Sequence, residues 1–236
     1  MIAADPPPAS SPSPPPTNNG STAPPATGGY LSTNWAGYVA ISGSYTSVSG
    51  SWTVPSVTGN GSTTTADAAW IGVGGVFSGD LIQTGTFNTV SAGGQVSSFA
   101  FYELLPDAAL VIPSVQVTAG DNISATVAET SPGQWQISIT DNTTGQNFIT
   151  SVSYASSHSS AEWIEEDPSY GNGSQVPFDN FSSVFFDNGS LVANGTTANI
   201  GGADSKPITL VDSNGNPLAT PSILTNNGAG VSVTHN

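Results

Sequence analysis

From Tyr30 to its end, the chain consists of short runs of alternating apolar and polar residues, separated by groups of Gly, Asn, Asp, Ser or Pro. Alternation places successive side chains on opposite faces of a strand, and residues of the separating kind favour turns. The runs recur about every ten positions, a spacing typical of β-sandwiches and barrels. No window shows a clear 3.6-residue apolar period. The sequence therefore predicts an all-β fold.

The alternating runs also give approximate boundaries for the strands. A single domain over residues 30–236 is the simplest partition, because no internal repeat interrupts the pattern. We expect strands at residues 33–41, 47–54, 67–74, 81–90, 96–104, 108–118, 122–129, 134–140, 147–155, 160–167, 182–187, 197–200, 207–212 and 230–234.

Residues 1–29 have a different composition. They contain half of the 18 prolines, with Ser, Ala and Thr between them and few apolar side chains to bury. Such segments are extended and do not fold alone. We expect residues 1–29 to form a disordered tail or linker.

The charge balance restricts the partners and the working conditions of the protein. Its only basic side chain other than histidine is Lys206, against 16 acidic residues, and the formal net charge is −15. Phosphates of nucleic acids or of an anionic membrane surface would find almost no cations to bind. In acid most carboxylates are neutral, and little positive charge would accumulate to unfold the chain. The composition excludes nucleic-acid partners and favours work in acid.

Several classes of site are excluded by residue type. The chain has no Cys and two His, too few for a structural zinc site, and it shows no EF-hand spacing. A Ser-His-Asp triad would need His158 or His235, but there is no G-x-S-x-G motif, and a histidine would be protonated in acid. No run of 18 apolar residues is present to span a membrane. We expect no metal, no cofactor and no membrane span, and we expect any export signal to have been removed or replaced.

Residues 161–168 read Ala-Glu-Trp-Ile-Glu-Glu-Asp-Pro and place four acids in six consecutive positions. In a strand, Glu162, Ile164 and Glu166 would share one face. An acidic edge strand kept soluble by its charge is one interpretation. The other is a half-sheltered carboxyl whose pKa is tuned for proton transfer. The pattern alone leaves both open.

Five sequence blocks in a fixed order resemble the glutamic peptidases (eqolisins), a family of acid-acting secreted endopeptidases. The resemblance covers roughly residues 33–187, with a weaker continuation. It implies an antiparallel β-sandwich of two large sheets, of the lectin-like jelly-roll type. The blocks are Asn34-Trp35-Ala36-Gly37-Tyr38, Ala68-Ala69-Trp70-Ile71-Gly72, Leu81-Ile82-Gln83-Thr84-Gly85, Phe101-Tyr102-Glu103 and residues 161–167.

The resemblance also implies the site residues. It places the catalytic glutamine on Gln83 and the catalytic glutamate on Glu166, the last acid before Asp167. A carboxylate remains partly ionised in acid and can activate water, while a neutral amide can orient that water and stabilise the tetrahedral intermediate. Glu162 shares the face of Glu166 and is its chief rival. The residues expected in substrate binding or in support of the site are Trp70, Glu103, Trp35 and Glu162.

The chain departs from the fungal pattern at three places. Gly74-Gly75 replaces an acid, Thr86-Phe87-Asn88 replaces a segment with an Asp, and Leu104 replaces a Trp. These changes concern the substrate pocket more than the catalytic pair.

We expect a secreted, monomeric endopeptidase that acts on polypeptides in acid. Two alternatives remain open at this point. One is a glycosidase that uses Glu103 and Glu166 as its two carboxylates. The other is a carbohydrate-binding sandwich module without catalytic activity.

Overall fold

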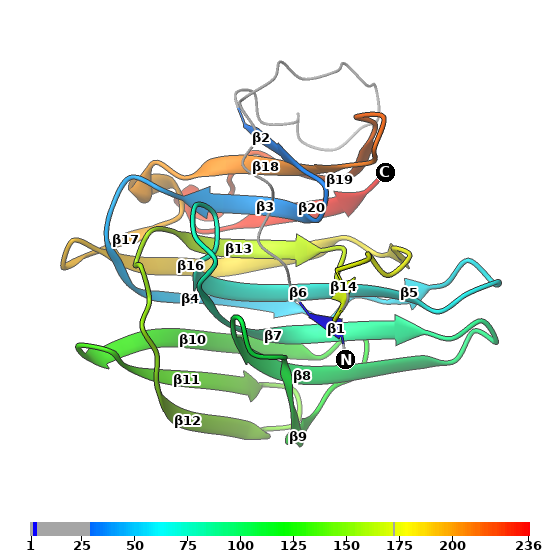
Figure 1. Ribbon diagram of the computed structural model, residues 1–236, viewed down its shortest axis with the longest axis horizontal. Helices are drawn as coiled ribbons and strands as arrows, with labels where there is room; N and C mark the ends of the chain where they lie inside the picture. Colours follow the sequence, from blue (N-terminus) through cyan, green and yellow to red (C-terminus); the bar gives the residue numbers. More distant parts are fainter. Residues whose placement is uncertain (1, 4–28, 172) are drawn as a thin grey trace.

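The computed structural model describes residues 2–3, 29–171 and 173–236 (Figure 1). In these ranges the regular structure is β-strand, apart from two 3₁₀ helices, η1 (Gly201–Ala203) and η2 (Asn226–Gly228). The expected tail at residues 1–29 lies outside the described residues except for residues 2, 3 and 29. The first two form β1 (Ile2–Ala3), which pairs with β14 (Ser169–Tyr170). The predicted all-β fold is confirmed.

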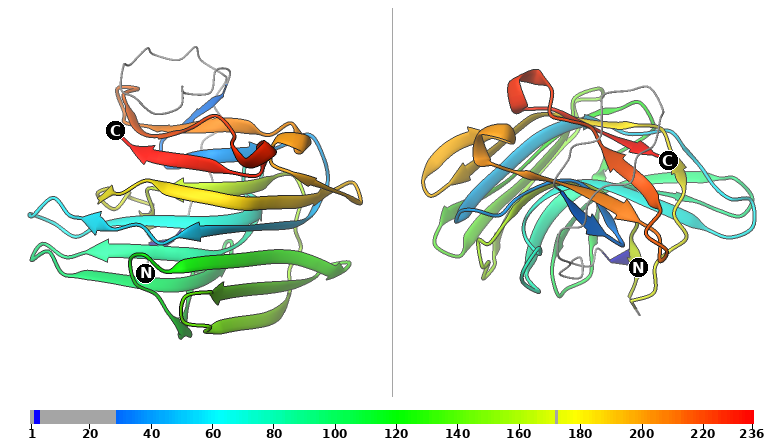
Figure 2. Two further views of the ribbon diagram at one scale, coloured as in Figure 1. Left: turned by 180° about the vertical axis from the view of Figure 1, so that it is seen from behind. Right: turned by 90° about the horizontal axis from the view of Figure 1, so that it is seen from above.

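Most strands belong to one continuous sheet that folds back on itself in two layers (Figures 1 and 2). The front layer contains, in spatial order, β3 (Trp35–Ala40), β13 (Ala161–Glu166), β6 (Thr65–Gly74), β7 (Leu81–Val90), β8 (Val96–Leu104) and β9 (Leu110–Gln116). The back layer contains β16 (Val184–Ala193), β4 (Tyr45–Thr53), β10 (Asn122–Ser131), β11 (Gln134–Asp141) and β12 (Asn147–Ser153).

The two layers are joined at one end by β20 (Val231–His235), β19 (Pro217–Pro221) and β18 (Lys206–Val211). At the other end β9 and β12 contact each other, so the sheet nearly closes into a barrel. The pairing is antiparallel except that β2 (Tyr30–Ser32) runs parallel to β18. At the margins, β17 (Thr196–Asn199) pairs with β16, and β5 (Val57–Thr58) pairs with β15 (Asn180–Phe181). The sandwich expected from the sequence is thus present, but its two layers are halves of a single sheet.

All the runs that the sequence predicted as strands overlap observed strands. The short strands β2, β5, β14, β15 and β19 were not predicted, because two to five residues give no visible alternation.

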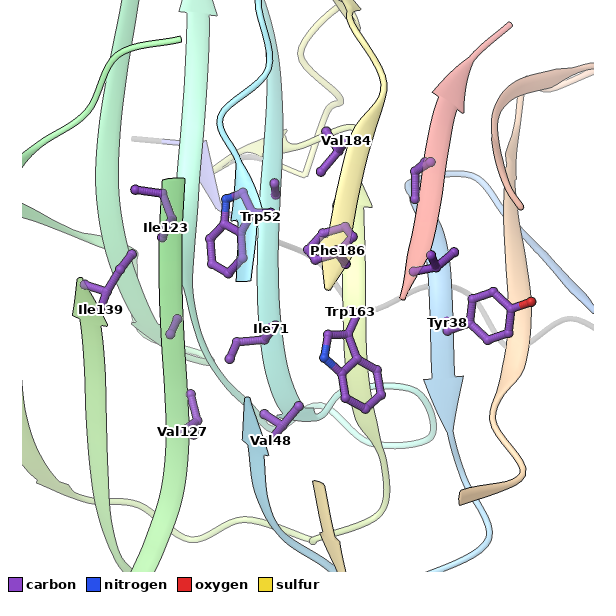
Figure 3. Packing of buried hydrophobic residues seen from close by; sticks show 14 of the residues in the cluster. Tyr38, Val48, Trp52, Ile71, Ile123, Val127, Ile139, Trp163, Val184 and Phe186 are labelled. Carbon is purple, nitrogen blue, oxygen red and sulfur yellow. The ribbon is translucent and has the colours of Figure 1, made fainter. Parts of the chain in front are cut away.

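The main core lies between the two layers. Inward-facing side chains of both layers meet there, among them Ile71 and Trp163 from the front and Trp52 and Phe186 from the back (Figure 3). The rings of Trp52 and Phe186 lie 5.8 Å apart. The indole N–H of Trp163 donates to the Ser49 carbonyl across the layers at 2.9 Å. Burial of these large side chains supplies most of the stabilising free energy of such a domain.

A second, smaller apolar cluster covers the opposite side of the front layer, which we call the outer face. It includes Trp35, Trp70, Leu81, Phe101 and Ile164, all buried. Because side chains alternate along a strand, the neighbours of Ile71 and Trp163 in β6 and β13 point to this face. Within the described ranges, we find no helix with the length and apolar character needed to cross a bilayer.

Candidate active site

Antiparallel pairing of four front-layer strands places Gln83 and Glu162 on one line across the sheet. Gln83 of β7 lies opposite Gly72 of β6, and Gly72 lies opposite Glu162 of β13. On its other side Gln83 lies opposite Glu103 of β8. Their strand neighbours belong to the outer-face cluster at alternate positions, so all these residues face outward. We call Glu103, Gln83, Gly72 and Glu162 the polar row.

Gly72 separates Gln83 and Glu162 in the register. The two residues lie two strand spacings apart, about 9.6 Å between their Cα atoms. The Leu81 and Trp70 side chains lie over Gly72. A Cβ atom at position 72 would lie only 2.9 Å from Leu81 Cδ1 and 3.0 Å from Trp70 Cζ3.

The amide of Gln83 is held by a carboxyl group. Its Nε2 donates to Glu103 Oε2 at 2.8 Å, and both residues are buried. The other end of the amide, Oε1, is buried without a hydrogen-bond partner among the described residues. Gln83 therefore keeps an oriented acceptor beside Gly72.

Glu162 is a buried acid in an apolar setting. Its side chain has no exposed surface, and neither carboxyl oxygen has a hydrogen-bond partner among the described residues. Burial raises its pKa well above the ordinary value, and the negative charge of Asp80 adds to this. The hydroxyl of Ser160 lies near enough to lower the pKa by a smaller amount.

Glu166, the glutamate that the resemblance assigned to catalysis, does not lie on the polar row. It is opposite Ala68 of β6 and Trp35 of β3. Four residues along β13 separate it from Glu162, about 13 Å of strand, in addition to the two strand spacings from Gln83. The register thus aligns Gln83 with Glu162, the rival candidate, while the assignment of Glu166 to catalysis stays a prediction.

The two glutamates of the alternative glycosidase pair, Glu103 and Glu166, are also far apart in strand register. Glu103 lies on the polar row, three strands away from the strand of Glu166 and at a different level along the sheet. The two carboxyl groups do not face each other across a shared space, as glycoside hydrolysis requires.

The two tryptophans predicted near the site lie on the outer face and touch each other. The rings of Trp35 and Trp70 are 4.9 Å apart at an interplanar angle of 77°, an edge-to-face contact. The indole N–H of Trp70 donates to Glu166 Oε2 at 2.7 Å. Trp70 therefore connects Glu166 with the polar row, where its Cζ3 atom approaches Gly72.

The histidines lie away from the polar row. His158 is 3.0 Å from Glu129 and stacks on Trp135, and His235 packs against Phe178 and Phe181. Among the residues described, no group of three or more His, Cys, Asp or Glu is placed to hold a metal ion.

Comparison with known proteins identifies the family of the chain. The model of the peptidase A4 family matches residues 33–235. Aspergillopepsin-2 of Aspergillus niger is 32% identical over 227 residues, which cover 86% of this chain and 78% of that protein. Scytalidopepsin B of Scytalidium lignicola is 32% identical over 192 residues, which cover 77% and 70%. The chain belongs to the peptidase A4 family.

Solved structures of A4 peptidases share its fold. Scytalido-glutamic peptidase, solved with a transition-state analogue inhibitor, superposes with a TM-score of 0.73 at 27% identity and covers 86% of this chain and 98% of that one. Aspergilloglutamic peptidase from Aspergillus niger gives a TM-score of 0.65 at 30% identity, with 73% and 99% covered. This A4 peptidase is therefore a glutamic-type endopeptidase, as the resemblance predicted, and its substrates are polypeptides.

Sequence reasoning missed two residues of this A4 peptidase's site. Gly72 was treated as the end of a motif, although it separates the two polar side chains. Ser160 drew no attention, yet it is fully buried and lies near Glu162. A hairpin register for residues 65–90 would have placed Gly72 opposite Gln83, but the proximity of Ser160 depends on a distant strand.

Proposed function

We propose that this A4 peptidase hydrolyses peptide bonds in acid with Gln83 and Glu166 as its catalytic pair, the residues on which the glutamine and glutamate of the family motif fall. The Trp70 indole supports this proposal, because its N–H donates to Glu166 Oε2 at 2.7 Å and favours the ionised carboxylate, while its Cζ3 atom approaches Gly72, the residue opposite Gln83. Glu162 is the second candidate, since it lies in register with Gln83, but burial raises its pKa well above the ordinary value and would keep it protonated in acid. Gln83 Oε1 has no hydrogen-bond partner among the described residues and can accept from a water molecule held by Glu166.

The chemistry follows from these two groups. Ionised Glu166 takes a proton from the water as the water oxygen attacks the carbonyl carbon of the substrate. An N–H of Gln83 donates to the oxyanion of the tetrahedral intermediate, while Glu103 keeps the amide oriented. Protonated Glu166 then passes its proton to the departing amine. The C–N bond breaks, and Glu166 returns to its ionised form.

A neutral amide is a suitable partner for a buried carboxylate. A second carboxylate in its place would repel Glu166 and raise its pKa. A histidine base would be protonated in acid and unable to accept a proton.

The polar row is fully buried in this structure, so peptide and water reach it only when the outer face opens. The last residue of β6, Gly74, and the next residue, Gly75, both have a φ of +96°. A Cβ atom at Gly75 would lie 3.1 Å from Trp35 Cη2, so the segment that follows β6 lies against the outer-face cluster.

We propose further that the protein works as a secreted monomer in an acidic medium. With a net charge of −15 and a single lysine, it has little to bind nucleic acid or an anionic membrane. The absence of cysteine leaves no thiol for an oxidising medium to attack.

The test is digestion of unfolded casein from about pH 2 to pH 7, with pepstatin present, by wild type and variants. Glu166→Gln and Gln83→Ala each lose at least about 1,000-fold in kcat/KM, since each removes a group that acts in the transition state. Asp107→Asn, at an exposed carboxyl, is the matched control and keeps wild-type activity. Substantial activity in Glu166→Gln, with its fold intact by circular dichroism, refutes the proposed pair, and loss of activity in Glu162→Gln alone would favour the second candidate.

A further inference from the structure

Beyond the polar row, several outward-facing residues of β7, β8 and β9 are large and apolar. Phe87 of β7 packs against the outer-face cluster, and Phe99 and Phe101 of β8 lie beside it. The rings of Phe87 and Phe99 are stacked with centroids 5.1 Å apart, and those of Phe87 and Phe101 meet edge to face at 5.9 Å. Val111 of β9 lies opposite Phe101. We call Phe87, Phe99, Phe101 and Val111 the apolar shelf.

The apolar shelf is open to solvent along one side. Phe99 is 36% exposed and Val111 is 48% exposed, while Phe87 is half-buried. Adjoining exposed apolar side chains are a common mark of a ligand-binding surface. The next outward-facing residues of β7 and β8, Thr89 and Ser97, are uncharged, although the chain has 16 acidic residues. The shelf therefore suits an uncharged, apolar group.

The apolar shelf is continuous with the catalytic face. Glu166, Ala68, Phe87 and Phe99 lie on one row across four neighbouring strands. Since adjacent strands are about 4.8 Å apart, the Cα atoms of Phe87 and Phe99 lie about 9.6 Å and about 14 Å from that of Glu166. An extended peptide advances about 3.3 Å per residue. A substrate that crosses these strands would place over the shelf a side chain about three or four residues from the bond at Glu166.

We propose that the apolar shelf is a specificity subsite, which selects an aromatic or large aliphatic side chain of the polypeptide substrate about three or four residues from the scissile bond. This inference rests on the proposed catalytic function of the outer face and names the side-chain class that the enzyme prefers there. A substrate Phe that packs on Phe99 and Val111 removes apolar surface of both partners from water. An amide or charged side chain in the same place loses hydration without gaining a polar side-chain partner from the shelf.

The test measures selectivity with internally quenched peptides that differ at a single position, from four residues before to four residues after the scissile bond. That position carries Phe, Gln or Lys, and mass spectrometry confirms that the same bond is cut. At one position, three or four residues from the bond, we expect wild type to cleave the Phe peptide with at least about 10-fold higher kcat/KM than the Gln peptide. Phe99→Ala should reduce this ratio to less than about threefold. Phe185→Ala is the matched control, because Phe185 is 37% exposed on β16 of the back layer, and it keeps the wild-type ratio.

A charge placed on the shelf gives a second, independent readout. Val111→Glu, at the most exposed residue of the shelf, should raise kcat/KM for the Lys peptide relative to the Phe peptide by at least about 10-fold over wild type at about pH 5, where a glutamate is largely ionised. A defect in folding alone would not reverse a preference at one position. Circular dichroism melting identifies any variant that fails to fold, and the other variant then decides.

Two results overturn the subsite. One is an unchanged ratio of Phe to Gln in folded, active Phe99→Ala, together with an unchanged ratio of Lys to Phe in Val111→Glu. The other is equal cleavage of the Phe and Gln peptides by wild type at every position. The selectivity ratio can be measured on the active enzyme whichever glutamate is the base. The proposed pair fails by a different result, namely substantial activity in Glu166→Gln.

Discussion

At the scale of single residues, the site depends on the absence of a side chain at Gly72. Gly72 lies between Gln83 and Glu162, and the space above it is bounded by Leu81 Cδ1 and Trp70 Cζ3. Any larger residue would displace these neighbours. The glycine is required here by the close approach of side chains and not by its backbone conformation.

Gly72→Ala should therefore impair both stability and activity. The new methyl group must displace two buried side chains, which costs about 1–3 kcal/mol of unfolding free energy. It also displaces the Trp70 indole that donates to Glu166, so kcat/KM should fall by at least about 10-fold. Urea unfolding and casein digestion measure the two effects. Gly79→Ala is the control, since nothing lies within 4 Å of its Cβ position. Equal loss in both variants would contradict the role given to Gly72.

At the scale of elements, β13 carries different chemistry on its two faces. Glu162 and Glu166 point to the outer face, while Trp163 points into the core between the layers, where its indole donates to Ser49 of β4. At Gly50 of the same strand, a Cβ atom would lie 3.1 Å from the Trp163 ring. The position of the proposed base thus depends on packing against the back layer.

Truncation of Trp163 tests how strongly the two layers hold β13. Trp163→Ala should lower the free energy of unfolding by about 3–5 kcal/mol, because it leaves a cavity between the layers and removes a buried hydrogen bond. Chemical unfolding at the pH of greatest stability gives the value. Phe77→Ala, at an aromatic side chain that is 62% exposed, should change it by less than about 0.5 kcal/mol. A loss below about 1 kcal/mol in Trp163→Ala would show that β13 is held by other contacts.

At the scale of the whole molecule, acids buried near one another couple stability to pH. Asp67, Glu165 and Asp179 form this group, and Asp167 lies near Asp179. Burial raises the pKa of Asp67 to about 6, of Asp167 to about 8 and of Asp179 to about 9, and it raises that of Glu165 as well. Neighbouring acids raise the pKa of Asp179 and Glu165 further. The protonated forms can share hydrogen bonds that the ionised forms cannot.

The sign of this coupling follows from the proton balance. Between an ordinary aspartate pKa of 3.8 and the raised values, the folded chain binds more protons than the unfolded chain. The free energy of unfolding must therefore decrease as pH rises, by about 1.4 kcal/mol per pH unit for each proton held. The stabilisation is complete below about pH 4 and is lost progressively toward pH 9.

Asp179→Asn should make the protein less sensitive to this rise in pH. Its neutral amide cannot ionise, so the melting temperature should exceed that of wild type at pH 7 and differ little from it at pH 3. Thermal melts from pH 3 to pH 8 provide the measurement. Asp107→Asn removes an equal charge from the exposed surface and controls for net repulsion. Parallel pH curves for Asp179→Asn and wild type would show that Asp179 does not contribute to the pH dependence.

The sequence alone determined the fold class and most strand positions. Alternation over residues 81–90 and 134–140 is a local signal, and the pairing of a strand with a nearby partner leaves it unchanged. The blocks around Trp70, Gln83 and residues 161–167 also identified the family, because their order along the chain requires no knowledge of contacts.

Only the tertiary structure decided which glutamate stands in register with Gln83 and which one accepts from Trp70. Glu162 and Glu166 share one face of β13, so alternation cannot distinguish them. The choice depends on the register between β13 and β6, strands about ninety residues apart in the chain, and register is set by packing of the whole sheet. A shift of four residues keeps every side chain on its face but moves a carboxyl by about 13 Å. Local sequence therefore specified the chemistry available at the site, and the pairing of distant strands selected the groups that meet there.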